Sequence, residues 1–182
     1  LVRAGLLPGD WPYVCHAVSG YSGGGKALIA RFEDDADIAF RDYGLAMGHK
    51  HLPEMARYAG LAHAPVFAPA VVPAHRGMVV EVPLHLHLMA GTPRASVLRE
   101  ALADFYATSP VVRVHAETPD EILLRRSAEP WDGLDLHVCE AKDGSQARLV
   151  AVLDNLGKGA SGAAVQNLNL MAGLPETAGL RL

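Results

Sequence analysis

The sequence has few of the features that mark secreted, membrane-spanning or nucleic-acid-binding proteins. It contains only two cysteines, Cys15 and Cys139, in unrelated contexts, so we expect no disulfide framework and a reducing, cytoplasmic setting. The longest apolar stretches, such as Ala64 to Ala74, are interrupted by prolines and are shorter than the roughly 20 residues of a membrane helix. The formal net charge is -4, and no basic run exceeds Arg125–Arg126. We therefore expect neither a membrane nor a nucleic acid as a partner.

Hydrophobic residues, in contrast, are plentiful. They make up 50% of the 182 residues, which is enough for one core, and we expect a single domain over residues 1–182. The chain starts with Leu1 rather than methionine, and Leu1 to Pro8 contains the glycine and proline that end a helix. A helix end without its beginning suggests that an upstream segment is missing. We therefore expect an incomplete active site.

Short apolar runs outnumber helical patterns. Strands are expected at Tyr13–Val18, Val66–Val72, Gly77–Leu88, Val111–His115, Leu134–Ala141 and Gln146–Leu153. Helices are expected at Lys26–Phe32, Pro53–Leu61, Thr92–Tyr106 and Ala163–Met171. Several strands are adjacent in sequence, and Lys142–Ser145 is a good hairpin turn. The pattern predicts an α+β domain with a mixed, mostly antiparallel sheet and helices on one face.

The segment His49-Lys50-His51-Leu52-Pro53-Glu54 holds the densest group of reactive side chains. Pro53 and Glu54 favour the start of a helix, which places His51 at its N-terminal end. The helix dipole favours a neutral imidazole there, and a neutral imidazole suits a base near pH 7. Surface histidines beside a helix cap remain an equally open interpretation.

Two glycine-rich loops could approach an anionic ligand. Ser19–Gly25 offers backbone N–H groups and two hydroxyls, although it matches neither a Walker nor a Rossmann pattern. Asp154–Gly162 precedes a helix and contains Lys158 and Ser161, which could hold an anion at the helix N-terminus. Arg76 could clamp a carboxylate or phosphate. The alternatives are plain connecting loops and a surface arginine.

A second His-x-His motif, His85 and His87, falls in the strand expected at Gly77–Leu88, where both rings would share one face. Together with His49 and His51, these residues could build a histidine-based metal site, but we favour no metal. Both cysteines lie in apolar strands, where cysteine behaves as a small hydrophobe. We expect neither to be a nucleophile.

Four blocks resemble N-acetyl-gamma-glutamyl-phosphate reductases, in this order along the chain. They are SGYSGGGK (Ser19–Lys26), HKHLPEM (His49–Met55), the stretch Phe67–Met78 with its FAP and RGM elements, and LDNLGKGASGAAVQNLNLMAGLPET (Leu153–Thr177). The last block is long and specific. With HKHLPEM, it is more similar to the shorter of the family's two types.

This resemblance implies a substrate-binding and dimerisation domain like the C-terminal domain of glyceraldehyde-phosphate dehydrogenase. In such enzymes a Rossmann NADP domain precedes it. The implied reaction is NADPH-dependent conversion of N-acetyl-glutamyl 5-phosphate to N-acetyl-glutamate 5-semialdehyde and phosphate, in arginine biosynthesis, through a cysteine nucleophile. The family's Asn-Pro-Gly-Cys motif and a GxGxxG motif are both absent here. We therefore expect the cysteine and most of the NADP(H) site to lie outside the chain, and the chain alone to be inactive.

The resemblance also implies roles for individual residues. The acid/base group would be His51, with His49 as second choice and Glu54 as the nearby carboxylate. The residues that would bind substrate are Ser19, Gly20, Ser22 and Arg76. The residues that would face the cofactor are Asn155, Lys158 and Gly159. Residues from about 160 to 182 would pack back on the missing domain, so the apolar side of their helix, with Val165, Leu168 and Met171, would be exposed here.

The assembly implied is a homodimer or a dimer of dimers. Three alternatives stay open. The first is another semialdehyde dehydrogenase, such as one for an amino-adipyl homologue, because one methylene is worth only about 1 to 3 kcal/mol. The second is a histidine-based metal-binding β-domain. The third is a dimerisation module with no ligand site.

Overall fold

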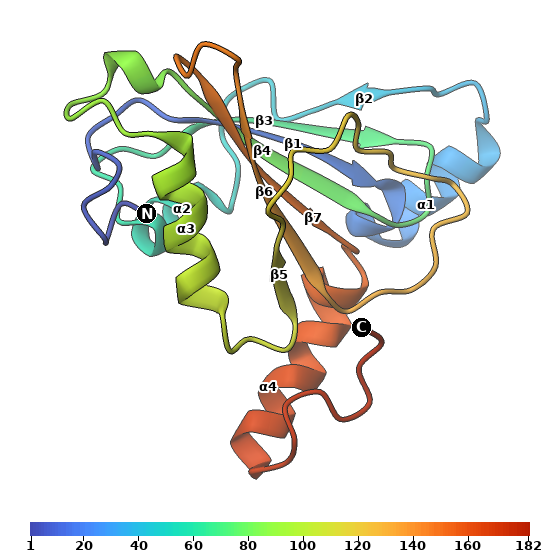
Figure 1. Cartoon of the computed structure of the whole chain (residues 1–182). Helices are drawn as coiled ribbons and strands as arrows, with labels where there is room; N and C mark the ends of the chain where they lie inside the picture. The colour runs from blue at the N-terminus through green and yellow to red at the C-terminus, as the bar shows by residue number, and fades with distance from the viewer.

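The computed structural model describes residues 1–182 and contains one seven-stranded sheet (Figure 1). The strands are β1 (Val14–Gly20), β2 (Arg41–Asp42), β3 (Val66–Val72), β4 (Met78–Leu84), β5 (Val112–Val114), β6 (Leu134–Glu140) and β7 (Ala147–Leu153). Their order across the sheet is β2-β3-β1-β4-β7-β6-β5. The pairs β1–β3 and β5–β6 are parallel, and the other adjacent pairs are antiparallel. The predicted mixed, mostly antiparallel sheet is confirmed.

Four α-helices and three short helical turns accompany the sheet. They are η1 (Tyr21–Gly24), α1 (Gly25–Asp34), α2 (Leu52–Ala59), η2 (Leu86–Leu88), α3 (Ala95–Tyr106), η3 (Gly157–Ser161) and α4 (Gly162–Ala172). Local signals account for the ends of α2, which has Pro53 in its first turn and is closed by Gly60 at φ 73°. No helix of the chain is both long enough and apolar enough to cross a membrane.

Helices α2 and α3 pack on the same face of the sheet. Side chains alternate along a strand, so residues that are cross-strand partners, such as Cys15 and Phe67, share a face. Leu52 and Met55 of α2 pack against the cluster that contains those two side chains. Val82 packs against this cluster and also against the larger core under α3, which shows that both clusters lie on one side.

The larger core lies between α3 and the middle of the sheet. Ala95 and Leu98 of α3 are 0% exposed and pack with Leu84 of β4 and Val138 of β6. Burial of each leucine or valine side chain of this group stabilises the fold by about 1.5–3 kcal/mol. This fixes α3 on the sheet and leaves the edge at β2 and β3 free for a pocket.

The opposite face of the sheet carries no helix. The segment between β5 and β6, residues 115–133, runs across part of it (Figure 1), and Leu124 lies against Gly77. Glu81 and Arg148 form an exposed ion pair on this face, with 3.4 Å between Arg148 Nη1 and Glu81 Oε2. The fold therefore has one helix-covered face and one largely open face.

One strand prediction is wrong at its end. β4 stops at Leu84, and Leu86–Leu88 forms a 3₁₀ turn instead of continuing the strand to residue 88. Leu86 and Met89, three residues apart, are both buried in the core, and a helical turn allows this whereas a strand does not. His85 and His87 therefore do not project from one strand face.

The last helix, α4, extends beyond the sheet (Figure 1). Leu168 is 62% and Met171 86% exposed, as predicted for the apolar side of this helix, and Val165 is half-buried. Apolar surface of α4 is therefore open to solvent in this chain.

Candidate active site

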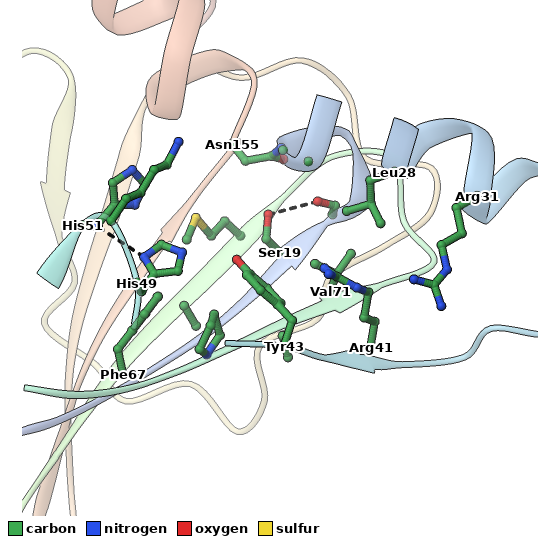
Figure 2. Close-up of a pocket in the computed structure, with 18 of the residues that line it drawn as sticks. Ser19, Leu28, Arg31, Arg41, Tyr43, His49, His51, Phe67, Val71 and Asn155 are labelled. Carbon is green, nitrogen blue, oxygen red and sulfur yellow. Dashed lines mark hydrogen bonds between the residues drawn. The ribbon is translucent and has the colours of Figure 1, made fainter. Parts of the chain in front are cut away.

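A cavity of about 600 Å³ lies on the helix-covered face, near the edge formed by β2 and β3 (Figure 2). The floor comes from alternate residues of β1 and β3, and the walls come from α1, the loop after β2 and the start of α2. Its lining includes Ala17, Ser19, Gly20, Leu28, Arg31, Arg41, Tyr43, His49, Lys50, His51, Phe67, Pro69, Val71, Met78 and Asn155. No aspartate or glutamate is among the lining residues.

The turn from β1 into α1 brings the backbone close to the β3–β4 connection. A Cβ atom on Gly20 would lie 2.8 Å from the carbonyl oxygen of Ala74, which is too close for any other residue. Gly25 begins α1 at φ 72°, where glycine is favoured. This tight turn sets α1 beside the cavity, so Leu28 and Arg31 face it.

His49 is held by aromatic neighbours at one end of the cavity. Its ring centroid lies 4.8 Å from that of Phe67, 4.9 Å from that of His51 and 6.0 Å from that of Tyr43. Its Nδ1 accepts a hydrogen bond from the backbone N–H of His51, at 3.3 Å. Because Nδ1 accepts, the neutral ring carries its proton on Nε2, which points into the cavity in Figure 2.

Burial, followed by the nearby charges of His51 and Lys50, lowers the pKa of His49 below its ordinary value of 6.5. His49 is therefore a neutral N–H donor at neutral pH. His51 is more exposed, and its ring makes no hydrogen bond within the chain, so both ring nitrogens are available to a ligand. The pair can thus polarise a carbonyl oxygen and carry a proton.

The structure brings together some of the residues predicted to form the site and separates others. His49, His51, Ser19 and Gly20 line the cavity. Glu54 is exposed on α2 and forms no hydrogen bond or ion pair with either histidine. Its predicted role as their carboxylate partner thus has no support in the geometry.

Arg76 and Ser22 are structural braces that do not line the cavity. Arg76 Nη1 donates to Asp154 Oδ2 at 2.9 Å, and Asp154 is 3% exposed. The hydroxyl of Ser22 accepts from the side-chain amide of Asn155 at 2.9 Å. Arg76 is therefore already neutralised by a carboxylate and is poorly placed to clamp a ligand.

The three residues predicted to face the cofactor are also largely committed to the protein. Asn155 lines the cavity, but its Oδ1 accepts from the N–H of Gly77 at 2.9 Å while its amide donates to Ser22. The ammonium of Lys158 donates to Gln166 of α4. Only Gly159 is exposed and unengaged by a side chain, so these residues offer little to hold a nucleotide.

Four polar residues of the site received no role from the sequence: Arg31, Arg41, Tyr43 and Lys50. Arg41 is aligned with Val71 by the β2–β3 register, and Val71 belongs to the cavity floor. Its guanidinium carbon lies 4.6 Å from the centre of the Tyr43 ring. The local signal for this pair was their spacing of two residues, which places both side chains on one side of an extended chain. The strand itself is only two residues long, Arg41–Asp42.

The remaining histidines and the cysteines form no second reactive centre. The ring centroids of His85 and His87 lie 6.0 Å apart. His85 is hydrogen-bonded to the side chain of Gln146, and His87 to the carbonyl oxygen of Ser145. No group of three or more His, Cys, Asp or Glu is placed to hold a metal ion. Burial raises the pKa of both thiols, that of Cys15 to about 11. Neither thiol is activated for attack.

The known proteins to which this chain is similar include N-acetyl-gamma-glutamyl-phosphate reductases. The chain is 43% identical to an N-acetyl-gamma-glutamyl-phosphate reductase of Trichormus variabilis, over 99% of this chain and 60% of that protein. It is 46% identical to the protein of the same name from Brucella canis, over 93% of this chain and 57% of that protein. The chain thus spans less than two thirds of the length of these curated relatives.

Solved structures with a similar fold include semialdehyde dehydrogenases. A probable aspartate-semialdehyde dehydrogenase from Pseudomonas aeruginosa matches with a TM-score of 0.61 and 18% identity, over 88% of this chain and 54% of that one. Aspartate semialdehyde dehydrogenase II from Vibrio cholerae, complexed with ASA, matches with a TM-score of 0.55 and 17% identity, over 88% and 55%. The family described as semialdehyde dehydrogenase, dimerisation domain, matches residues 1–155. The chain therefore belongs to the semialdehyde dehydrogenase dimerisation-domain family.

Proposed function

We propose that this chain is the substrate-binding and dimerisation part of an NADPH-dependent reductase that converts N-acetyl-glutamyl 5-phosphate to N-acetyl-glutamate 5-semialdehyde and phosphate. The observation that carries the proposal is the cavity, which combines two adjacent imidazoles with three cationic side chains and no carboxylate. Such a cavity suits a small polyanion with a reacting carbonyl group. The identity of 43–46% to reductases of this name supports the same substrate.

In this mechanism His49 and His51 divide the work. The Nε2–H of His49 donates a hydrogen bond to the carbonyl oxygen of the acyl group and stabilises the negative charge that develops there. His51 takes the proton from the attacking thiol and later returns a proton to the same oxygen. Because the pKa of His49 is lowered, its ring is neutral at and above neutral pH. The Nε2–H therefore remains a donor as the pH rises.

The nucleophile and most of the cofactor site would come from outside these 182 residues. The buried thiols of Cys15 and Cys139 are too weakly acidic for the attack. NADPH, when bound, supplies the hydride, and this chain would contribute little beyond the exposed loop at Gly159. We therefore propose that residues 1–182 alone are inactive.

We propose that the open face of the sheet is the dimer interface. We also propose that the enzyme is cytoplasmic. The family takes its name from dimerisation, and no helix covers this face. Val14 and Val66, which are neighbouring cross-strand partners on it, remain 38% and 49% exposed. Pairing of this face with a second copy would bury them.

The test is a turnover assay with the full-length protein that contains this chain. We expect reduction of NADP⁺ with N-acetyl-glutamate 5-semialdehyde that depends on added phosphate. The leading rival is another semialdehyde dehydrogenase of the superfamily, so the same assay is run with aspartate 4-semialdehyde and the amino-adipyl homologue. A higher kcat/KM for either of those substrates would replace the proposal with that rival.

A further inference from the structure

We propose that Arg31 and Arg41 form a carboxylate-binding pair that selects N-acylated amino acids over free ones. The proposal rests on the proposed function and extends it, because it assigns the part of the substrate that does not react. It also gives the cavity a reason to prefer an acetylated substrate.

Arg31 and Arg41 have no carboxylate partner within the chain. Four of the twelve arginines form ion pairs with carboxylates, and of the other eight only Arg31 and Arg41 line this cavity. Both line a cavity without aspartate or glutamate. A guanidinium without a partner is a fork of donors that matches a carboxylate.

The two side chains approach the same cavity from different elements, Arg41 from β2 and Arg31 from α1. Arg41 projects from β2 on the same side as its cross-strand partner Val71, and the Tyr43 ring supports its guanidinium at 4.6 Å. Arg31 lies one helical turn after Leu28 on α1, on the side that faces the cavity. Figure 2 shows Arg31 reaching from α1 and Arg41 from β2 at the end of the cavity away from His49. Both guanidinium groups are thus available to a ligand in this one cavity.

The Tyr43 ring limits the distance between Arg41 and His49. Its centroid lies 6.0 Å from that of His49 and 4.6 Å from the guanidinium carbon of Arg41, so this carbon and the His49 ring centre are at most 10.6 Å apart. The reacting carbonyl at His49 and the α-carboxylate at the arginines thus occupy opposite ends of one extended ligand.

The charge of the cavity then acts as a filter at the α-position. A free α-ammonium would lie beside Arg31 and Arg41 with no carboxylate to pair with it, and like charges at that distance repel. An N-acetyl group removes this charge. Its methyl can contact the apolar surface of Leu28 and Val71, which line the same end.

The experiment measures dissociation constants of the full-length protein for three stable probes. N-acetyl-L-glutamate carries the acetamide and the α-carboxylate, 4-acetamidobutyrate lacks the α-carboxylate, and L-glutamate carries a free ammonium. We expect N-acetyl-L-glutamate to bind about 10- to 100-fold more tightly than either of the others, the range for charge-assisted hydrogen bonds.

Variants then assign the difference to the arginines. Arg41→Ala and Arg31→Ala should each weaken binding of N-acetyl-L-glutamate about tenfold or more and leave 4-acetamidobutyrate unchanged, while Arg41→Lys restores part of the loss. Arg57→Ala, an exposed arginine of α2 that does not line the cavity, is the control and should change nothing. Equal thermal midpoints confirm that the variants are folded.

Two outcomes overturn the proposal. If 4-acetamidobutyrate binds wild-type protein as tightly as N-acetyl-L-glutamate, the α-carboxylate is not recognised. If L-glutamate binds as tightly as N-acetyl-L-glutamate, the cavity does not discriminate against a free α-ammonium. Turnover in the same preparation separates the two levels of the account. Turnover with an unchanged KM in Arg41→Ala refutes only the arginine pair, whereas no phosphate-dependent turnover in wild type refutes the proposed function.

Discussion

The Nδ1 atom of His49 accepts a hydrogen bond from the backbone N–H of His51, with 3.3 Å between the two nitrogens. The contact fixes which nitrogen of His49 carries the proton and leaves the His51 ring unengaged. The sequence His-Lys-His thus yields two imidazoles of different character from one turn of chain. One is a fixed donor, and the other, whose ring is unengaged, is the proposed acid/base group.

This division predicts different kinetics for two substitutions in the full-length enzyme. His51→Ala should lower kcat about 10²- to 10⁴-fold and remove the acidic limb of the pH profile of kcat/KM. His49→Ala should lower kcat about 10²- to 10³-fold, the usual loss for one donor to a developing oxyanion, and keep that limb. If His49→Ala, rather than His51→Ala, abolishes the limb, then the two roles are reversed.

Folding stability should fall in mild acid because of His137. This histidine is buried on β6 and stacked on His115 with ring centroids 4.3 Å apart. Burial, followed by the charge of His115, lowers its pKa, while Asp135 opposes the shift. In mild acid the unfolded chain therefore binds a proton at His137 more readily than the folded chain does. The contribution of His137 to the free energy of unfolding is present above pH 6.5 and is lost as the pH falls below it, by at most about 1.4 kcal/mol per pH unit.

The measurement is urea unfolding at pH 7.5 and 5.5 for wild type and His137→Gln. We expect the variant to lose less stability between these two pH values than wild type does. An identical loss in the two proteins would mean that His137 does not carry the effect.

Arg76 should matter for folding and not for substrate. Arg76→Ala leaves the buried carboxylate of Asp154 without its ion partner, although the N–H groups of Trp131 and Leu156 still donate to it. We expect a loss of about 2–4 kcal/mol in the free energy of unfolding, near the range for a broken buried pair. The KM of the substrate should stay unchanged, in contrast to Arg41→Ala. A large rise in KM at full stability would return Arg76 to the binding site.

The start of α4 should tolerate no side chain at Gly162. A Cβ atom there would overlap the buried carboxylate of Asp132, which also holds Arg181. Gly162→Ala should therefore cost about 1–3 kcal/mol through overpacking. Gly48→Ala, where nothing lies within 4 Å of the added Cβ, is the matched control and should be near neutral. Thermal unfolding of both variants checks the difference.

Local signals in the sequence were sufficient for much of the fold. The apolar run Val66–Val72 is β3 with the same bounds, and Pro53 and Gly60 bracket α2. The predicted end of β4 was wrong because Leu86 and Met89 are buried in the core under α3. That core includes residues far away in sequence, such as Val138. Local periodicity cannot contain that information.

The candidate site was predictable only in part, for the same reason. His49 and His51 were found because they belong to one short motif. Arg41 was missed, since its position depends on the pairing of a two-residue strand with Val71, thirty residues later. Arg76 was predicted to bind substrate. Its ion partner Asp154 lies 78 residues away, and no local pattern reveals that pairing.

The most direct test of this account is a crystal structure of the full-length protein with N-acetyl-L-glutamate bound. We expect the ligand to fill the cavity between α1 and β3, with its side-chain carboxylate at His49 Nε2 and its α-carboxylate at Arg31 and Arg41. A ligand bound in the reverse orientation, or outside this cavity, would contradict it.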